Sequence, residues 1–263
     1  MRKSKPGRIV DNMAIYPETN LGGMEMLTKN DRVALITGAT GGLGKVVARH
    51  FAQAGHRLAL VGSHAGRLAD LSAELDLPGD KLMTFIADLT QPDEVGKVHQ
   101  AVIDKFGKVD ILLHLVGGWR GGKALEAVTE EDVATMLSHH VWMTFYLAQA
   151  FLPGMRMNGW GRLIVISSPV VAAPPAKNLP YTVGKSGQEA LVLTLAEELK
   201  YSGVTANIIR VRTIDTKHER EHSPSPSNAF WTTPEEIASA IGYLCSDEGA
   251  AINGARLPLY GSP

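Results

Sequence analysis

Hydrophobic and polar positions follow two different rhythms from about residue 32 onward. Short apolar runs rich in branched residues are typical of strands buried on both faces of a parallel sheet. Longer segments in which apolar residues return every three or four positions are typical of amphipathic helices. The predicted strands are Val33–Ile36, His56–Val61, Leu82–Ala87, Val109–Val116, Arg162–Ser167 and Thr205–Val211. The predicted helices include Gly66–Leu75, Pro92–Phe106, Glu130–Leu152 and Tyr181–Tyr201.

Because the two rhythms alternate, helical crossovers are expected to join parallel strands. We therefore predict an α/β fold with a doubly wound parallel sheet, Rossmann-like, in three α/β/α layers. The 263 residues, 44% of them hydrophobic, are enough for one substantial core, and residues 31–263 are predicted to form a single domain. Residues 1–30 combine a basic opening with scattered proline and glycine. They are predicted to be a poorly packed extension, with a targeting arm as the alternative.

The turn after the first predicted strand is crowded with glycine. Apolar residues then recur at helical spacing as far as Gly55. A strand, a glycine turn and a helix bring bare backbone and the positive end of the helix dipole close to a phosphate. A P-loop is excluded because Ala39 and Val46 occupy positions where that motif needs glycine and serine or threonine, and the spacing also departs from G-x-G-x-x-G. The glycines are Gly38, Gly41, Gly42 and Gly44.

A tyrosine and a lysine lie one helical turn apart in Tyr181-Thr-Val-Gly-Lys185. Positions i and i+4 share a helix face, and a nearby ammonium stabilises a phenolate. Lys185 is therefore predicted to lower the pKa of Tyr181 from its usual value of about 10 toward neutrality. Ser168 follows a predicted strand thirteen positions before Tyr181. The three side chains together predict proton transfer to or from a substrate oxygen.

The pattern Thr37-Gly38-x-x-x-Gly42-x-Gly44, followed by this serine, tyrosine and lysine, resembles the short-chain dehydrogenase/reductase family over nearly all of residues 32–261. The resemblance implies an NAD(P)(H)-dependent oxidoreductase that transfers a hydride between nicotinamide and a carbonyl or alcohol carbon. It implies that Ser168 binds the substrate oxygen, that Tyr181 exchanges its proton and that Lys185 also holds the nicotinamide ribose. The cofactor-binding residues that it implies in the turn are Thr37, Gly38, Gly42, Leu43 and Gly44.

Several further positions match the family pattern less closely. Asp88 and Leu89 follow the third predicted strand, where the family binds adenine, although Asp88 is also a good helix cap. The family's Asn-Asn-Ala-Gly motif aligns with residues 114–117, of which only Gly117 matches; the resemblance implies that Gly117 contacts the cofactor. His140 aligns with an asparagine of the family's proton relay, with a packed polar residue as the alternative. Thr216 aligns with a threonine that contacts the nicotinamide amide.

Two alternatives to the main interpretation stay open. The Gly117–Gly122 turn and the short stretch 213–234 resemble the dihydropteridine reductase branch, in which Trp119 and Trp142 would either stack on a flat substrate or pack in the core or an interface. Ser168 departs from that branch. The second alternative is a catalytically weak nucleotide-sensing regulator, motivated by the departures at positions 114, 140 and 212. The intact serine, tyrosine and lysine argue against it.

The end of the second predicted strand favours NADP over NAD. A carboxylate there would bind the ribose diol and repel a 2′-phosphate, but the sequence reads Val61-Gly62-Ser63-His64. Ser63 can donate to a phosphate, and Arg67 can pair with it.

Composition limits the partners. A net charge of −1 gives no overall attraction to nucleic acid or to an anionic membrane, and no apolar run approaches the ~20 residues of a membrane span. The single cysteine, Cys245, excludes an intrachain disulfide and fits a cytoplasmic protein. We therefore expect a small-molecule substrate, no nucleic acid and no membrane partner. The family resemblance implies a homodimer or homotetramer through residues 130–152 and 181–201.

The string His218-Glu-Arg-Glu-His222 matches the H-E-x-x-H zinc motif. Zinc chemistry needs both histidines on a helix packed against a core, with a third ligand nearby. This run is wholly polar and leads into Ser-Pro-Ser-Pro, so we interpret it as part of a lid and predict no metal.

Overall fold

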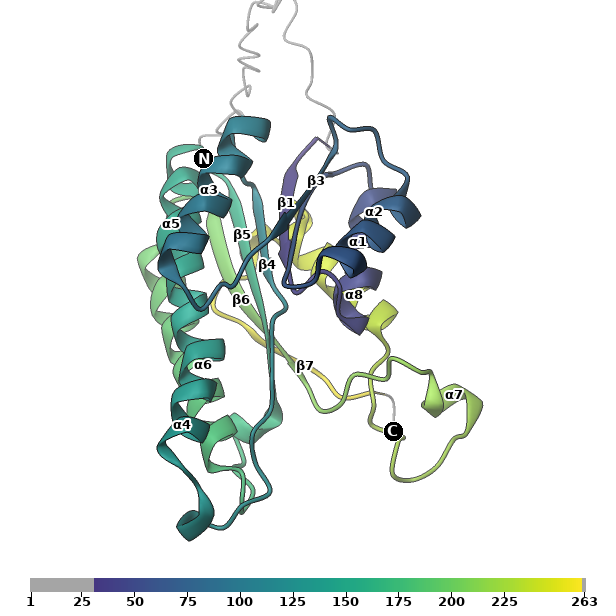
Figure 1. The fold of residues 1–263 in the computed structure, drawn as a ribbon, viewed down its shortest axis with the longest axis vertical. Helices are drawn as coiled ribbons and strands as arrows, with labels where there is room; N and C mark the ends of the chain where they lie inside the picture. Colours follow the sequence, from purple (N-terminus) through teal and green to yellow (C-terminus); the bar gives the residue numbers. More distant parts are fainter. Residues whose placement is uncertain (1–30, 262–263) are drawn as a thin grey trace, which may run out of the picture.

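The computed structural model describes residues 31–261, so the predicted extension at 1–30 lies outside the described residues. Seven strands form one sheet in the order β3-β2-β1-β4-β5-β6-β7, and every neighbouring pair is parallel (Figure 1). This order confirms the predicted doubly wound, Rossmann-like sheet. The strands are β1 Val33–Thr37, β2 Arg57–Gly62, β3 Leu82–Ile86, β4 Ile111–His114, β5 Gly161–Ser167, β6 Val204–Val211 and β7 Arg256–Leu259.

Helices cover both faces of the sheet, which confirms the three α/β/α layers. In Figure 1, α1, α2 and α8 lie on one side of the sheet, and α3, α4, α5 and α6 lie on the other. The helices are α1 Gly42–Gln53, α2 Ala65–Leu75, α3 Pro92–Phe106, α4 Glu130–Leu137, α5 Met143–Met157, α6 Leu179–Glu198, α7 Glu219–His222 and α8 Pro234–Cys245. None of the helices within residues 31–261 has the length and apolar character needed to cross a bilayer.

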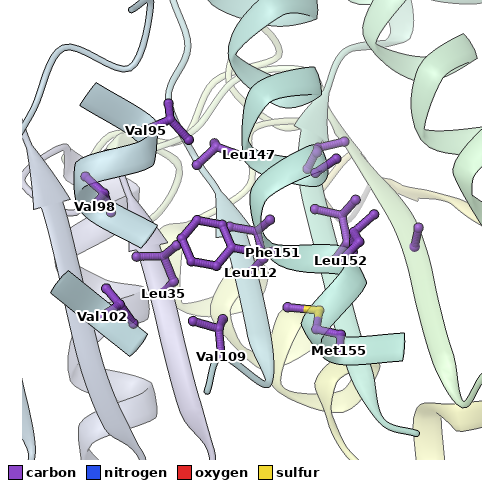
Figure 2. Packing of buried hydrophobic residues seen from close by; sticks show 14 of the residues in the cluster. Leu35, Val95, Val98, Val102, Val109, Leu112, Leu147, Phe151, Leu152 and Met155 are labelled. Carbon is purple, nitrogen blue, oxygen red and sulfur yellow. The ribbon is translucent and has the colours of Figure 1, made fainter. Parts of the chain in front are cut away.

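The central strands are buried on both faces because their side chains alternate between two cores. Leu35 of β1 and Leu112 of β4 face α3 and α5, where Phe151 packs among them (Figure 2). Their neighbours Ile36 and Leu113 enter the opposite core. Burial of such side chains, at about 25 cal/mol per Å² of apolar surface, fixes the sheet and therefore the line along which its carboxyl ends meet.

The predicted helix Glu130–Leu152 differs from the structure. A π-helical turn, Ser138–Trp142, separates α4 from α5. The Thr144 hydroxyl donates to the backbone carbonyl of His140 at 2.6 Å, and a Cβ at Gly184 of α6 would lie 2.8 Å from the Met136 carbonyl. A side chain bonded into the ladder and a close helix crossing both disturb regular α-helical pairing.

The end of the fourth predicted strand also differs. The prediction ran to Val116, whereas β4 ends at His114. The two residues left over line cavities described below. The edge strand β7 was not among the predicted strands because it is short, partly exposed and contains Pro258, so its apolar signal is weak.

Candidate active site

The glycine turn brings the start of α1 against the end of β1. Gly38 has a φ of +69°, and a Cβ at Gly44 would lie 2.2 Å from the Gly38 carbonyl oxygen, so neither position tolerates a side chain. No side chain caps α1, which leaves its first N–H groups available to an anion. A Cβ at Gly42 would lie 2.5 Å from the Thr216 methyl, so Thr216 packs directly on the turn.

A cavity of about 410 Å³ opens beside this turn, and we name it the glycine-turn cavity. It contains four of the residues predicted to bind the cofactor, namely Gly38, Ser63, Asp88 and Leu89. The sequence analysis did not identify the remaining lining residues, because apolar and backbone contacts carry no motif. They are Thr40, Val61, Gly62, Ala87, Thr90, Val116, His139 and Met143.

A second cavity of about 180 Å³, the Tyr181 cavity, adjoins the first through Val116. It brings together Leu43, Gly117, Tyr181 and Lys185 from the predicted set. These residues come from α1, the loop after β4, and α6, which meet at the carboxyl ends of the strands. The other lining residues are Leu115, Val116, Gly118, Ile166, Ser167, Val211, Arg212, Thr213 and Ile214.

Ser168 follows β5, and Tyr181 and Lys185 lie in the first turns of α6. The Ser168 hydroxyl hydrogen-bonds to the Tyr181 phenol. Lys185, only 5% exposed, donates from Nζ to the Ile166 carbonyl at 2.7 Å and to Gln188 Oε1 at 2.9 Å. Two of the three N–H groups of the lysine ammonium are thus held by the protein, and one is left for a ligand.

The predicted effect of the lysine on the tyrosine is wrong for this structure. Burial raises the pKa of Tyr181 above its usual value, and the hydrogen bond with Ser168 offsets this only in part. Burial also lowers the pKa of Lys185 to about 7, so the lysine is not a permanent cation. The reason is desolvation, which disfavours both charged forms.

His140 lies against Tyr181, and burial keeps its ring neutral. The two rings meet edge to face, with centroids 5.6 Å apart. His140 Nε2 lies 3.2 Å from the Gly118 carbonyl, so this nitrogen carries the hydrogen. Burial lowers the pKa of His140 to about 2, which keeps the ring neutral. These features favour the packed-residue alternative, in which the His140 ring lies against Tyr181.

A buried polar network behind Lys185 escaped the sequence analysis. Gln188 accepts from Lys185 and donates to the Thr144 hydroxyl at 3.0 Å, and Thr144 in turn bonds the π-turn carbonyl of His140. The network therefore connects Lys185 to the break between α4 and α5. A helical repeat of i and i+3 polar residues in α6 was its only sequence signal.

Glu189 anchors the same helix to the sheet. Its carboxylate is 1% exposed and accepts from Ser167 Oγ at 2.7 Å, from Arg210 Nη2 at 2.6 Å and from Arg256 Nε at 2.9 Å. These hydrogen bonds keep the pKa of Glu189 below its usual range despite its burial. The group therefore fixes β5, β6 and β7 relative to Lys185.

Thr37 and His114 form a buried pair in the interior. Thr37, predicted to bind the cofactor, is fully buried, and its hydroxyl lies 2.8 Å from His114 Nδ1. Burial lowers the pKa of His114 to about 3. The pair joins the ends of β1 and β4 beneath the turn, so Thr37 acts through the backbone geometry and lines neither cavity.

The remaining candidates lie farther out. Ser63 bonds His64 Nδ1 at 2.8 Å, and Arg67 is exposed on α2. Trp119 donates from Nε1 to Asn178 Oδ1 at 2.9 Å, whereas Trp142 stacks on Tyr146 with centroids 5.9 Å apart. Neither tryptophan lines the two cavities.

The zinc-like string forms the single turn α7. His218 Nε2 lies 3.0 Å from Glu235, and His222 Nδ1 lies 3.3 Å from the Lys217 carbonyl. Within residues 31–261 no three histidine, cysteine or acidic side chains gather as metal ligands.

Comparisons with known proteins agree with this geometry. Residues 32–226 match the sequence model of the short chain dehydrogenase family. The 3-oxoacyl-acyl-carrier-protein reductase of Vibrio cholerae is 30% identical over 238 residues, covering 88% of this chain and 96% of the relative. The D-beta-hydroxybutyrate dehydrogenase of Rhizobium meliloti is 30% identical over 254 residues, covering 88% and 97%.

A solved structure extends the likeness to three dimensions. The crystal structure of a short chain dehydrogenase from Bacillus anthracis matches with a TM-score of 0.80 at 28% identity, covering 89% of this chain and 96% of that one. The sheet order, the glycine turn and the Ser168, Tyr181 and Lys185 group occur here in one chain. The chain therefore belongs to the short-chain dehydrogenase/reductase family of NAD(P)-dependent oxidoreductases.

Proposed function

We propose that this enzyme interconverts a carbonyl and an alcohol on a small molecule, with Tyr181 as the acid/base. The observation that carries the proposal is that Tyr181 and Lys185 line a cavity that adjoins the cavity beside the glycine turn, with Val116 lining both. A dinucleotide needs such a pair of adjoining sites. The two curated relatives are named as the reductase of a 3-oxoacyl group and the dehydrogenase of a hydroxy acid, which supports carbonyl and alcohol chemistry.

The residues fit a nicotinamide cofactor. The glycines clear space for a pyrophosphate, and the uncapped start of α1 offers N–H groups to it. Thr216 lies on the same turn, and Lys185 keeps one N–H for a ribose hydroxyl. When bound, the cofactor supplies or accepts the hydride.

The protein's own part is to hold and move a proton. The raised pKa of Tyr181 keeps its phenol protonated near neutral pH, as a general acid for carbonyl reduction requires. Ser168, bonded to that phenol, would donate to the same substrate oxygen. These features support the reductive direction.

NADP is the proposed cofactor. The end of β2 and the residue after it contribute Val61, Gly62 and Ser63 to the glycine-turn cavity, none of them acidic, and Arg67 follows one turn later on the exposed face of α2. The acidic lining residue of this cavity, Asp88, follows β3. A 2′-phosphate would accept from both Ser63 and Arg67.

We infer that the enzyme works as a homodimer or homotetramer in the cytoplasm. A groove of about 260 Å³ between α5 and α6 is lined by Phe145, Leu152, Leu191 and Leu195, among others. An apolar groove on two long helices supports association of copies. The buried free thiol of Cys245 fits a reducing compartment. Light scattering after gel filtration tests the association.

A substrate panel followed by nicotinamide absorbance tests the function. It contains small ketones, oxo acids, secondary alcohols and a quinonoid dihydropteridine, each run with NADP(H) and with NAD(H). Turnover of carbonyl substrates with NADPH is expected. Turnover confined to the pteridine would favour the dihydropteridine reductase alternative, and cofactor binding without any turnover would favour the nucleotide-sensing regulator.

A further inference from the structure

Arg212 is a cation that lines the Tyr181 cavity. It follows β6 directly and lines the same cavity as Tyr181 and Lys185. In the described part of the chain no acidic side chain pairs with it, and its side chain is exposed.

Other arginines close to the site show how unusual this is. Arg120 Nη1 lies 3.2 Å from Asp132, Arg210 Nη2 lies 2.6 Å from Glu189, and Arg220 Nη2 lies 2.6 Å from Glu236. Each of these guanidinium groups is neutralised by the protein. Of these four arginines, Arg212 is the one without an acidic partner among residues 31–261.

Two aromatic rings hold the Arg212 guanidinium in place. Its central carbon lies 5.1 Å from the Phe230 ring centroid and 5.7 Å from that of Tyr260. The segments that carry the two rings are joined, because the Thr232 hydroxyl donates to the Leu259 carbonyl at 2.7 Å. The planar group is therefore positioned before a ligand arrives, which lowers the entropic cost of binding.

A held guanidinium without a counterion is suited to bidentate binding of a carboxylate. We propose that Arg212 binds a carboxylate of the substrate, so that the enzyme's substrates are small oxo acids and the corresponding hydroxy acids. The inference rests on the proposed function, since it concerns the same cavity. Lys185, buried and bonded to the protein, is not free to serve as this anchor.

The cofactor's phosphates are the other possible source of an anion, because Leu43 of α1 lines the same cavity. The two sources predict different losses. If Arg212 binds a substrate carboxylate, its removal lowers the affinity for oxo acids and leaves the affinity for the cofactor unchanged. If Arg212 binds a phosphate, its removal lowers the affinity for the cofactor and changes the affinities for oxo acids and neutral ketones equally.

The test measures binding to enzyme saturated with NADP⁺, which cannot reduce a ketone. Pyruvate, acetoacetate, levulinate and phenylglyoxylate are titrated by calorimetry, each beside its methyl ester. The proteins are the wild type, Arg212→Met, Arg212→Lys, and the control Arg120→Met, which removes an arginine that already has acidic partners. Thermal melts check that each variant folds.

At least one acid is expected to bind the wild type more tightly than its ester, and Arg212→Met is expected to weaken that acid by roughly tenfold to hundredfold. Arg212→Met should bind the ester and NADP⁺ with the same Kd as the wild type. Arg120→Met should bind the acid with the wild-type Kd. Arg212→Lys should retain part of the affinity, because it keeps the charge but loses the planar fork.

Two results would overturn the inference: no acid in the panel with an affinity that depends on Arg212, or a loss of NADP⁺ affinity in Arg212→Met equal to any loss for the acids. Arg212-dependent binding of acids without turnover under NADPH would leave the inference standing and refute the proposed function. Turnover of esters and acids alike, with no dependence on Arg212, would support the proposed function and refute the inference about Arg212.

Discussion

The two adjoining cavities are built in opposite ways. Behind the Tyr181 cavity, polar side chains are buried and bonded to one another, from Lys185 through Gln188 to Thr144. At the glycine-turn cavity, Ser63 and Asp88 are exposed and bond only to close sequence neighbours, Ser63 to His64 and Asp88 to Thr90.

This difference sets what a substitution costs. Removing one partner from a buried group strands another, at roughly 1–3 kcal/mol for each unsatisfied atom. Removing an exposed partner lets water replace it, and exposed ion pairs contribute about 0–1 kcal/mol. Substitutions behind the Tyr181 cavity are therefore expected to lower stability. Substitutions at the exposed rim of the glycine-turn cavity can change the ligand preference without loss of stability.

The largest effect is expected at Tyr181. Tyr181→Phe removes the proton that the buried phenol holds at neutral pH, so turnover of any accepted carbonyl should fall by about 10²–10⁴-fold. The Kd of the cofactor, measured by fluorescence titration, should not change. Tyr243→Phe, on the exposed face of α8, is the matched control. Wild-type rates in Tyr181→Phe would refute the assigned role.

The second effect concerns stability. Glu189→Leu leaves Arg210 and Arg256 without their shared carboxylate, and breaking such a buried ion pair is expected to lower the free energy of unfolding by about 3 kcal/mol. Urea denaturation at pH 7 measures it. Glu197→Gln, which breaks an exposed pair with Lys200, should cost well under about 1 kcal/mol. Equal losses would mean that the buried network is no more costly to break than the surface.

These networks mark the limit of the sequence analysis. The strands, the glycine turn and the tyrosine and lysine pair could be predicted because each depends on local chemistry: buried runs, bare backbone and i, i+4 spacing. Gln188 and Glu189 could not be assigned, since their partners lie on β5, β6 and β7 and on α5, and tertiary packing alone brings them together.

The pKa of Tyr181 shows the same limit. Spacing placed a lysine one turn away and predicted a lower pKa, but spacing carries no information on burial. In the structure, desolvation outweighs the Ser168 hydrogen bond at Tyr181 and the charge of Glu189 at Lys185, and it favours the neutral form of both groups. His140 is a similar case, because alignment with the family asparagine gave no sign that the ring is buried and neutral.

The third prediction uses that desolvation. Burial lowers the pKa of Lys185 to about 7, whereas in the unfolded chain it stays near 10.5. Between these values the unfolded state binds the extra proton, so Lys185 makes the free energy of unfolding rise with pH, by up to about 1.4 kcal/mol per unit. Below pH 7 both states are protonated, and the slope vanishes.

Lys185→Met isolates this contribution. The free energy of unfolding of the wild type minus that of the variant, from urea curves between pH 6 and 10, should climb above pH 7, because other titrating groups cancel in the difference. Ser168→Ala, which leaves the lysine in place, should show the wild-type dependence. A flat difference for Lys185→Met would mean that the lysine is solvated, and the contrast between the two cavities would fail.

The smallest effect is expected at the exposed end. Arg67→Ala should lower kcat/KM for NADPH by up to about tenfold, the loss of one exposed charge-assisted contact to the 2′-phosphate, and leave the free energy of unfolding unchanged. NADH, which lacks that phosphate, is the internal control and should be used equally well by both proteins. Ser63→Asp should go further and repel the phosphate, which favours NADH. A wild type that prefers NADH, or an equal loss with both cofactors in Arg67→Ala, would show that this rim does not select the cofactor.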